Sequence, residues 1–131
     1  MTTNEAFSRV CRRVCKEHGW ELLPSGVHVK WPDGRHQVVA LEVFQHEQED
    51  LVRLFTTIGG TEKLTPIRLT IALRINCELA HGAFAVKDDN LIMVETLSLD
   101  NAGASEIEAS IRFLAETADY YEKAIFETDD H

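Results

Sequence analysis

Three side chains near the start of the chain have the types and the spacing that could bind a metal ion. Cys11, Cys15 and His18 would project from one side of a helix. A structural zinc site, however, closes four ligands in a tetrahedron, and one straight helix rarely supplies three of them. Nothing in the sequence places Cys77 beside this group. We interpret the cysteines as packed core thiols and His18 as a helix-end residue, and we expect neither a metal site nor a cofactor.

Two of the six histidines, His28 and His36, flank the Asp33-Gly34 turn on predicted strands and could lie near one another. A histidine that acts as a general base needs a nucleophile or an activated water beside it. The sequence contains no GxSxG or HExxH frame that would supply one. We therefore interpret the histidines as surface or strand-edge residues, and we expect no catalytic residues and no enzyme activity.

Two further segments offer groups that could bind ions. Asp88, Asp89 and Asn90 carry oxygen ligands, but they lack the spacing and the distal glutamate of a calcium loop. Gly59-Gly60-Thr61 precedes a predicted helix, yet it lacks the Lys-Ser/Thr pair of a P-loop. We predict a solvated turn at the first place and a strand-to-helix connection at the second.

The composition predicts a single domain over residues 1–131. A chain of 131 residues with 44% apolar side chains can bury about two-thirds of its unfolded surface. No apolar run approaches the roughly 18–20 residues that span a bilayer, and three cysteines give no disulfide framework. A net charge of −9 repels phosphate backbones. We expect a cytoplasmic protein that binds neither membranes nor nucleic acid.

The charge is distributed unevenly along the chain. Residues 1–40 hold six Lys or Arg against four Asp or Glu, a balance of +2, whereas residues 41–131 hold seven against eighteen, a balance of −11. The first predicted helix carries four of the six basic side chains of residues 1–40, namely Arg9, Arg12, Arg13 and Lys16. The chain therefore has an acidic body with a basic helix at its start, and we expect an acidic, frayed tail over residues 127–131.

The periodicity of apolar residues predicts helix, three strands, helix, two strands, helix. Consecutive strands joined by short turns pair antiparallel, so we predict an α+β fold with a five-stranded antiparallel sheet and helices packed against it. The last helix begins with a capping box of Ser105 and Glu108. The expected elements are helix Asn4–His18, strands Gly26–Trp31, Val38–Phe44 and Leu51–Ile58, helix Pro66–Ala80, strands Ala83–Val86 and Leu91–Leu97, and a helix from Ser105.

The central helix, predicted over Pro66–Ala80, carries apolar residues on more than one face. Such a helix is covered twice, and we expect the sheet to cover one face and a second subunit the other. The last helix also carries aromatic side chains opposite its main apolar stripe. We predict that these residues form a partner-binding surface or a dimer interface: Ile67, Ile71, Arg74, Glu78, Phe113 and Tyr120.

Asn76 lies in the middle of the apolar arc of the central helix. A buried amide must find hydrogen-bond partners, so we interpret Asn76 as a tie between the helix and neighbouring backbone. The alternative is a ligand contact in a pocket beneath the helix, which would also involve Trp31 and Cys77.

Several segments together resemble the YbjN family, whose members have the type III secretion chaperone-like fold. The resembling segments are WPDGRHQVVALEVF, LVRLFTTIGG and IALRINCELAHGAFAVKDDNLIMVETLSLD, followed by an amphipathic closing helix. The resemblance implies a small α+β domain, dimeric, that binds a protein segment as a chaperone or regulator. It implies no catalytic residues.

Two functional hypotheses follow. The first is a non-enzymatic interaction module, a homodimer that holds a segment of another protein. The second is a small-molecule or metal-binding sensor with a pocket beneath the central helix, near Trp31, Asn76 and Cys77.

Overall fold

The computed structural model describes residues 3–127, and it places three α-helices against one sheet. Apart from the backbone of Glu127, the predicted acidic tail lies outside the described residues. In chain order the elements are α1 (Thr3–His18), β1 (Glu21–Leu23), β2 (Gly26–Lys30), β3 (His36–His46), β4 (Glu49–Gly60), the 3-10 turn η1 (Thr61–Lys63), α2 (Pro66–Ile75), β5 (Ala83–Lys87), β6 (Asn90–Ser98), α3 (Ala104–Tyr121) and the π-helical segment η2 (Glu122–Glu127).

All neighbouring strands of the sheet are antiparallel, in the order β1-β2-β3-β4-β6-β5. The predicted α+β class is therefore confirmed, but the sheet has six strands rather than five. The additional strand, β1, pairs with β2 from Glu21↔His28 to Leu23↔Gly26. Three residues followed by Pro24 are too short to show the alternation that identifies a strand in a sequence.

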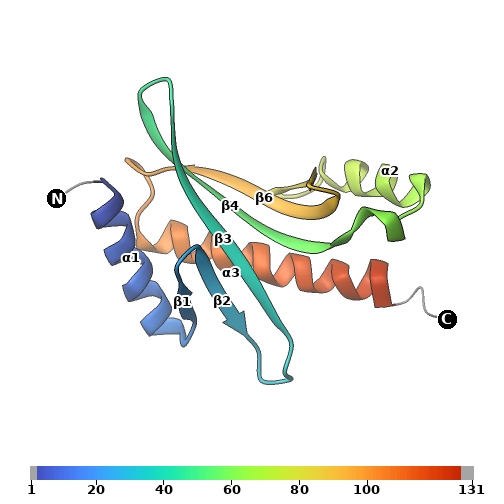
Figure 1. The fold of residues 1–131 in the computed structure, drawn as a ribbon, viewed down its shortest axis with the longest axis horizontal. Helices are drawn as coiled ribbons and strands as arrows, with labels where there is room; N and C mark the ends of the chain where they lie inside the picture. The colour runs from blue at the N-terminus through green and yellow to red at the C-terminus, as the bar shows by residue number, and fades with distance from the viewer. Residues whose placement is uncertain (1–2, 128–131) are drawn as a thin grey trace.

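The helices lie along and at the two ends of the sheet (Figure 1). The long helix α3 runs along one face, while α1 and α2 lie at opposite ends of the molecule. The buried face of α3 carries the apolar stripe expected from the sequence, with Ile107, Ile111 and Leu114 each at most 1% exposed. They meet Leu54 and Met93 of the sheet in the main core.

The start of α2 matches the sequence, but its length and its burial do not. The Thr65 hydroxyl accepts a hydrogen bond from the Arg68 N–H at 3.2 Å, and Pro66 occupies the first turn. The helix ends at Ile75, not at Ala80, because two tight turns follow, in which Cys77 and Glu78 donate to the carbonyls of residues three positions earlier. Only Ala72 of α2 is buried.

The capping box predicted at Ser105 and Glu108 is wrong. Helix α3 begins at Ala104, and the Glu106 carboxylate accepts a hydrogen bond from the Gly103 N–H at 2.9 Å. Only half of a capping box therefore forms, two residues earlier, because Gly103 has no side chain to accept from the Glu106 N–H.

Buried and half-buried polar side chains tie the end of α3 to the β2–β3 hairpin and to α2. The Arg35 guanidinium lies 2.6 Å from Asp119 and 3.3 Å from Glu122, and Glu122 also accepts from Gln37 at 3.0 Å. Arg68 of α2 donates a hydrogen bond to the backbone carbonyl of Ile125 in η2 at 2.6 Å. We refer to these contacts as the C-terminal clasp.

No helix in the part of the chain that the structure describes is long and apolar enough to cross a bilayer.

Candidate functional site

Half of β3 has a neighbouring strand on one side only. Strand β4 pairs with β3 from Ala40 to His46, whereas β2 pairs with it only from His36 to Ala40. The last bond to the β1–β2 hairpin joins the Leu41 N–H to the Ser25 carbonyl at 2.9 Å. Because backbone groups alternate between the two edges of a strand, those of Val43 share the direction of the Leu41 N–H. They point to an edge that β2 no longer covers.

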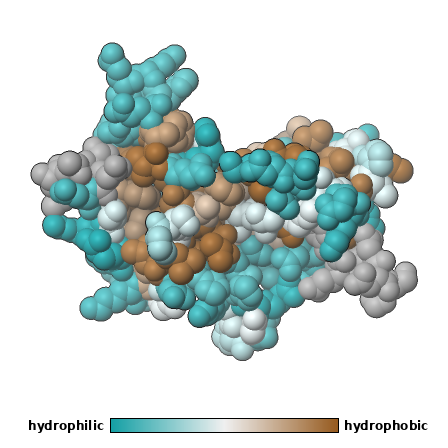
Figure 2. Space-filling view, in the orientation of Figure 1, coloured by the Kyte–Doolittle hydropathy of each residue, from teal (hydrophilic) through white to brown (hydrophobic). Residues whose placement is uncertain are grey.

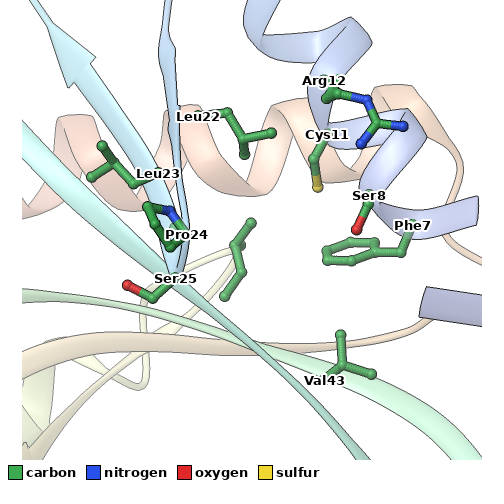
Figure 3. Close-up of a pocket in the computed structure, with 11 residues that line it drawn as sticks. Phe7, Ser8, Cys11, Arg12, Leu22, Leu23, Pro24, Ser25 and Val43 are labelled. Carbon is green, nitrogen blue, oxygen red and sulfur yellow. The ribbon is translucent and has the colours of Figure 1, made fainter. Parts of the chain in front are cut away.

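A cavity of about 430 Å³ lies between this edge and α1 (Figure 3). Figure 3 shows Phe7 and Cys11 from α1 facing Leu22 of β1 and Val43 of β3. Leu22 and Val43 are 39% and 38% exposed, which is high for apolar residues on the same sheet face as the core. We call this cavity the α1–β3 groove, lined by Phe7, Ser8, Cys11, Arg12, Leu22, Leu23, Pro24, Ser25, Gly26, Leu41 and Val43.

The rim of the groove is basic on the side of α1. Arg12 lines the groove and also a neighbouring surface hollow, together with Arg9, Ser8 and Glu5. The space-filling view shows apolar surface where α1 meets the strands (Figure 2). An apolar floor beside arginine side chains suits a segment that carries both apolar and acidic residues.

The structure gives other roles to the three candidate metal ligands, Cys11, Cys15 and His18. Cys11 and Cys15 are buried, as expected of core thiols, and burial raises both thiol pKa values, that of Cys11 to about 12. A protonated thiol is a poor metal ligand. His18 stacks on Trp20 with ring centroids 4.7 Å apart and lies 3.7 Å from Glu108. The interpretation of Cys77 as a core thiol is wrong, because it is exposed in the turn after α2.

A second apolar surface lies at the opposite end of the molecule, on α2. Ile67 and Ile71 are 72% and 47% exposed, and Leu73, on the other side of the helix, is 65% exposed. Between α2 and the outer strand β5 lies a hollow of about 240 Å³, lined by Leu69, Ala72, Leu73, Phe84, Ala85, Val86 and Leu91. We call the exposed apolar side chains of α2, together with Val86, the α2–β5 face. The sheet leaves this face uncovered, whereas Ala72 and Ile75, on another side of α2, pack on the core, as expected of a helix with one side covered by the sheet.

The other predicted interface residues lie on α2, in the turn that follows it, and on α3. Arg74 is exposed on α2, one turn beyond Ile71, and Glu78 is exposed in the turn that follows. Tyr120 on α3 is 63% exposed and contacts Tyr121, whose pKa is raised by burial and by the charges of Tyr120 and Glu78. Glu78 therefore lies near the end of α3. Phe113 is half-buried against the His81 ring at 5.6 Å, so it belongs mainly to the packing of α3.

Asn76 ties the end of α2 to β5, as the sequence analysis expected. Its side-chain amide donates to the Phe84 carbonyl at 3.2 Å, and its side-chain oxygen accepts from the Phe84 N–H at 2.7 Å. The structure does not gather it with Trp31, because Trp31 follows β2, and three strands separate β2 from β5. The hollow beside α2 is lined by neither Trp31, Asn76 nor Cys77.

Replacing Asn76 with alanine should destabilise the protein by about 1–3 kcal/mol, because it removes both hydrogen bonds to the backbone of buried Phe84. Urea unfolding followed by circular dichroism measures this difference. Asn101→Ala is the control, because the exposed Asn101 side chain makes only a 3.5 Å contact with Ser98. Equal losses of stability in the two variants would contradict the role of Asn76.

Comparisons with known proteins agree with this architecture. No protein-family model matches the sequence, and no curated protein matches it. A search of solved structures, however, matches the type III secretion chaperone SycH of Yersinia pestis, in complex with a stable fragment of YscM2. The identity is 17%, and the match covers 87% of this chain and 98% of that chain with a TM-score of 0.60. The chain has a type III secretion chaperone-like fold.

A second structure supports the same conclusion. The complex of HopA1 with its chaperone SchA matches with 6% identity, over 92% of this chain and 93% of that chain, with a TM-score of 0.57. The predicted type III secretion chaperone-like fold is thus confirmed, whereas membership in the YbjN family stays a prediction. Both matches are complexes that contain another protein or a fragment of one.

Sequence reasoning missed the α1–β3 groove. It results from the difference in length between β2, which has 5 residues, and β3, which has 11. The apolar run after the Asp33-Gly34 turn is longer than the run before it, and this difference was the one sequence signal that could have indicated an uncovered strand edge.

Proposed function

We propose that this chain is a non-enzymatic, cytoplasmic protein-interaction module, chaperone-like or regulatory, that acts as a homodimer and holds a segment of a partner protein. The observation that carries the proposal is the α1–β3 groove, in which an uncovered strand edge lies beside an apolar cavity. The similarity to chaperones in complex with partner proteins supports it.

The groove suits a partner segment in extended conformation. A segment that continues the sheet where β2 ends would hydrogen-bond to the backbone of Val43, and every second side chain would enter the cavity beside Phe7 and Leu22. Backbone pairing supplies affinity for many sequences, while the cavity selects apolar side chains at alternate positions. Arg12 at the rim favours an acidic residue next to them.

The α2–β5 face suits a second copy of the chain. Ile67 and Ile71, which are four residues apart on the same side of α2, remain in water in one copy, although monomeric proteins rarely expose contiguous apolar patches. Dimer interfaces are more apolar than the remaining surface, and β5 adds a free sheet edge to this one. The two proposed surfaces lie at opposite ends of the molecule, so one copy can use both (Figure 1).

The alternative is a small-molecule or metal-binding sensor, which would use the hollow between α2 and β5. The lining residues supply no charged side chain, whereas small-molecule sites combine apolar walls with a few polar groups that fix orientation. A second copy that packs on α2 explains the same hollow without a ligand. Stoichiometric small-molecule mass in native mass spectra of the purified protein would favour the sensor.

A photo-crosslinking amino acid at position 43 should capture a partner segment in cells of the source organism, because Val43 lies at the uncovered edge. Mass spectrometry should map the crosslinks to one extended segment with apolar residues at alternate positions. Adding Leu22→Asp should reduce capture about 10-fold or more, since a charge in the apolar cavity opposes insertion of the partner, while Leu22 is 39% exposed and outside the core.

The matched control places the same crosslinker at Val38, which is 42% exposed on the opposite face of β3. Equal capture from positions 38 and 43, or capture that Leu22→Asp leaves unchanged, would contradict partner binding in the groove.

A further inference from the structure

His28 and His36 lie side by side on the face of the sheet opposite the core. His36 pairs with Lys30 across the β2–β3 ladder, and His28 lies two residues before Lys30, so both rings project from the same face. Nε2 of His28 is 3.1 Å from Nδ1 of His36, and the ring planes are inclined by 75°. This contact plays no part in the groove or in the α2–β5 face.

The separation of these two nitrogens is close to what a metal ion requires. Two imidazole nitrogens bound to one zinc ion at about 2.0–2.1 Å lie about 3.3 Å apart in a tetrahedron. His36 is exposed, so its ring can turn until both lone pairs converge on one ion. The hairpin that joins β2 and β3 already fixes the backbone of both residues, which reduces the entropy lost on binding.

The other nitrogen of His28 lies near a carboxylate, the type of group to which metal-bound histidines usually donate a hydrogen bond. Its Nδ1 lies 3.6 Å from a carboxylate oxygen of Glu21, and the same oxygen lies 3.6 Å from the ammonium group of Lys30. A carboxylate on the nitrogen opposite the metal orients the ring and makes it a better ligand. Three strands therefore contribute: Glu21 from β1, His28 from β2 and His36 from β3.

We propose that His28 and His36 form an open two-histidine site for a divalent transition-metal ion, with Glu21 as the outer carboxylate and water at the remaining positions. The sequence analysis interpreted these two histidines as surface or strand-edge residues, and no group of three or more ligating side chains occurs among the described residues. Imidazole ligands select zinc, copper and nickel over magnesium and calcium. With two protein ligands, the site binds more weakly than a closed structural zinc site.

Zinc should stabilise the untagged protein, because an ion held by both histidines links β2 to β3 in the folded state only. We expect the melting temperature to rise by about 5 °C at saturating zinc and to be unaffected by magnesium. The experiment is performed on the Cys77→Ser variant, since the exposed Cys77 thiol is a competing zinc ligand. Isothermal titration calorimetry with zinc gives the stoichiometry, which should be one ion per chain.

Three variants and one control test the assignment. His28→Gln and His36→Gln should each abolish the thermal shift, and Glu21→Gln should weaken zinc binding about 10-fold. His46→Gln is the matched control, because His46 is an exposed histidine at the far end of β3 beside Glu47. The proposal is overturned if zinc up to about 1 mM gives no shift, or if His36→Gln responds to zinc as the parent does.

Discussion

Replacing Ile67 and Ile71 together with glutamate should convert the proposed homodimer into a monomer. Both side chains are largely exposed in one copy, at 72% and 47%, so the substitution leaves the fold of the subunit intact. In the proposed dimer it would place two carboxylates from each copy in an apolar interface, where unpaired charges are costly. We expect the dissociation constant of the dimer to rise at least about 100-fold, or about 2.7 kcal/mol.

Sedimentation velocity over a range of protein concentrations measures this change directly. Val38→Glu is the matched control, because Val38 is a similarly exposed apolar residue, 42% exposed, on a strand far from α2 in the sheet order. The control should remain dimeric. A parent protein that is monomeric at every concentration, or a double variant that dimerises as the parent does, would refute a dimer through the α2–β5 face.

Gly26→Ala should be the most damaging single-methyl substitution at the groove, with a loss of about 3 kcal/mol of stability or more. Gly26 is the first residue of β2 and is buried. An added Cβ would clash with the carbonyl oxygen of Val39 and approach the Cα of Ala40. These are backbone atoms of the neighbouring strand, so no side-chain rotation relieves the clash, and β2 must separate from β3.

A comparison with Gly34→Ala separates two effects of replacing a glycine. One is the steric clash of the added Cβ, and the other is the strain of the backbone. Gly34 has a φ of +90° and nothing within 4 Å of an added Cβ, so alanine there costs only the strain of the left-handed backbone, about 1–2 kcal/mol. Urea unfolding of both variants gives the two losses. If Gly26→Ala were no more destabilised than Gly34→Ala, the close packing of β2 on β3 would be disproved.

Local patterns predicted most of the fold. The Asp33-Gly34 turn, the Thr65-Pro66 helix start and the apolar stripe of the last helix are each encoded within a few residues, and the structure has all three. The burial of α2 was not predictable in the same way. A periodic pattern shows which residues are apolar, but it cannot show whether the same chain covers them: Ile67 and Ile71 were expected at an interface, and Leu73 is left exposed as well.

The candidate sites were less predictable than the fold because they depend on contacts between distant segments. Arg35 and Asp119 are 84 residues apart, and nothing near either residue indicates the other. The α1–β3 groove likewise depends on where β2 stops relative to β3. The proximity of His28 and His36 was foreseen, because a short hairpin joins them and fixes their relative position.

The C-terminal clasp has a consequence for the way the chain reaches its native state during synthesis. Ile107, Ile111 and Leu114, which complete the core, lie in the last third of the chain, and the clasp residues Asp119, Glu122 and Ile125 follow them. The sheet therefore emerges from the ribosome before the helix that covers its apolar face. Native packing must await the synthesis of α3, and a chain terminated before α3 would expose this face to aggregation.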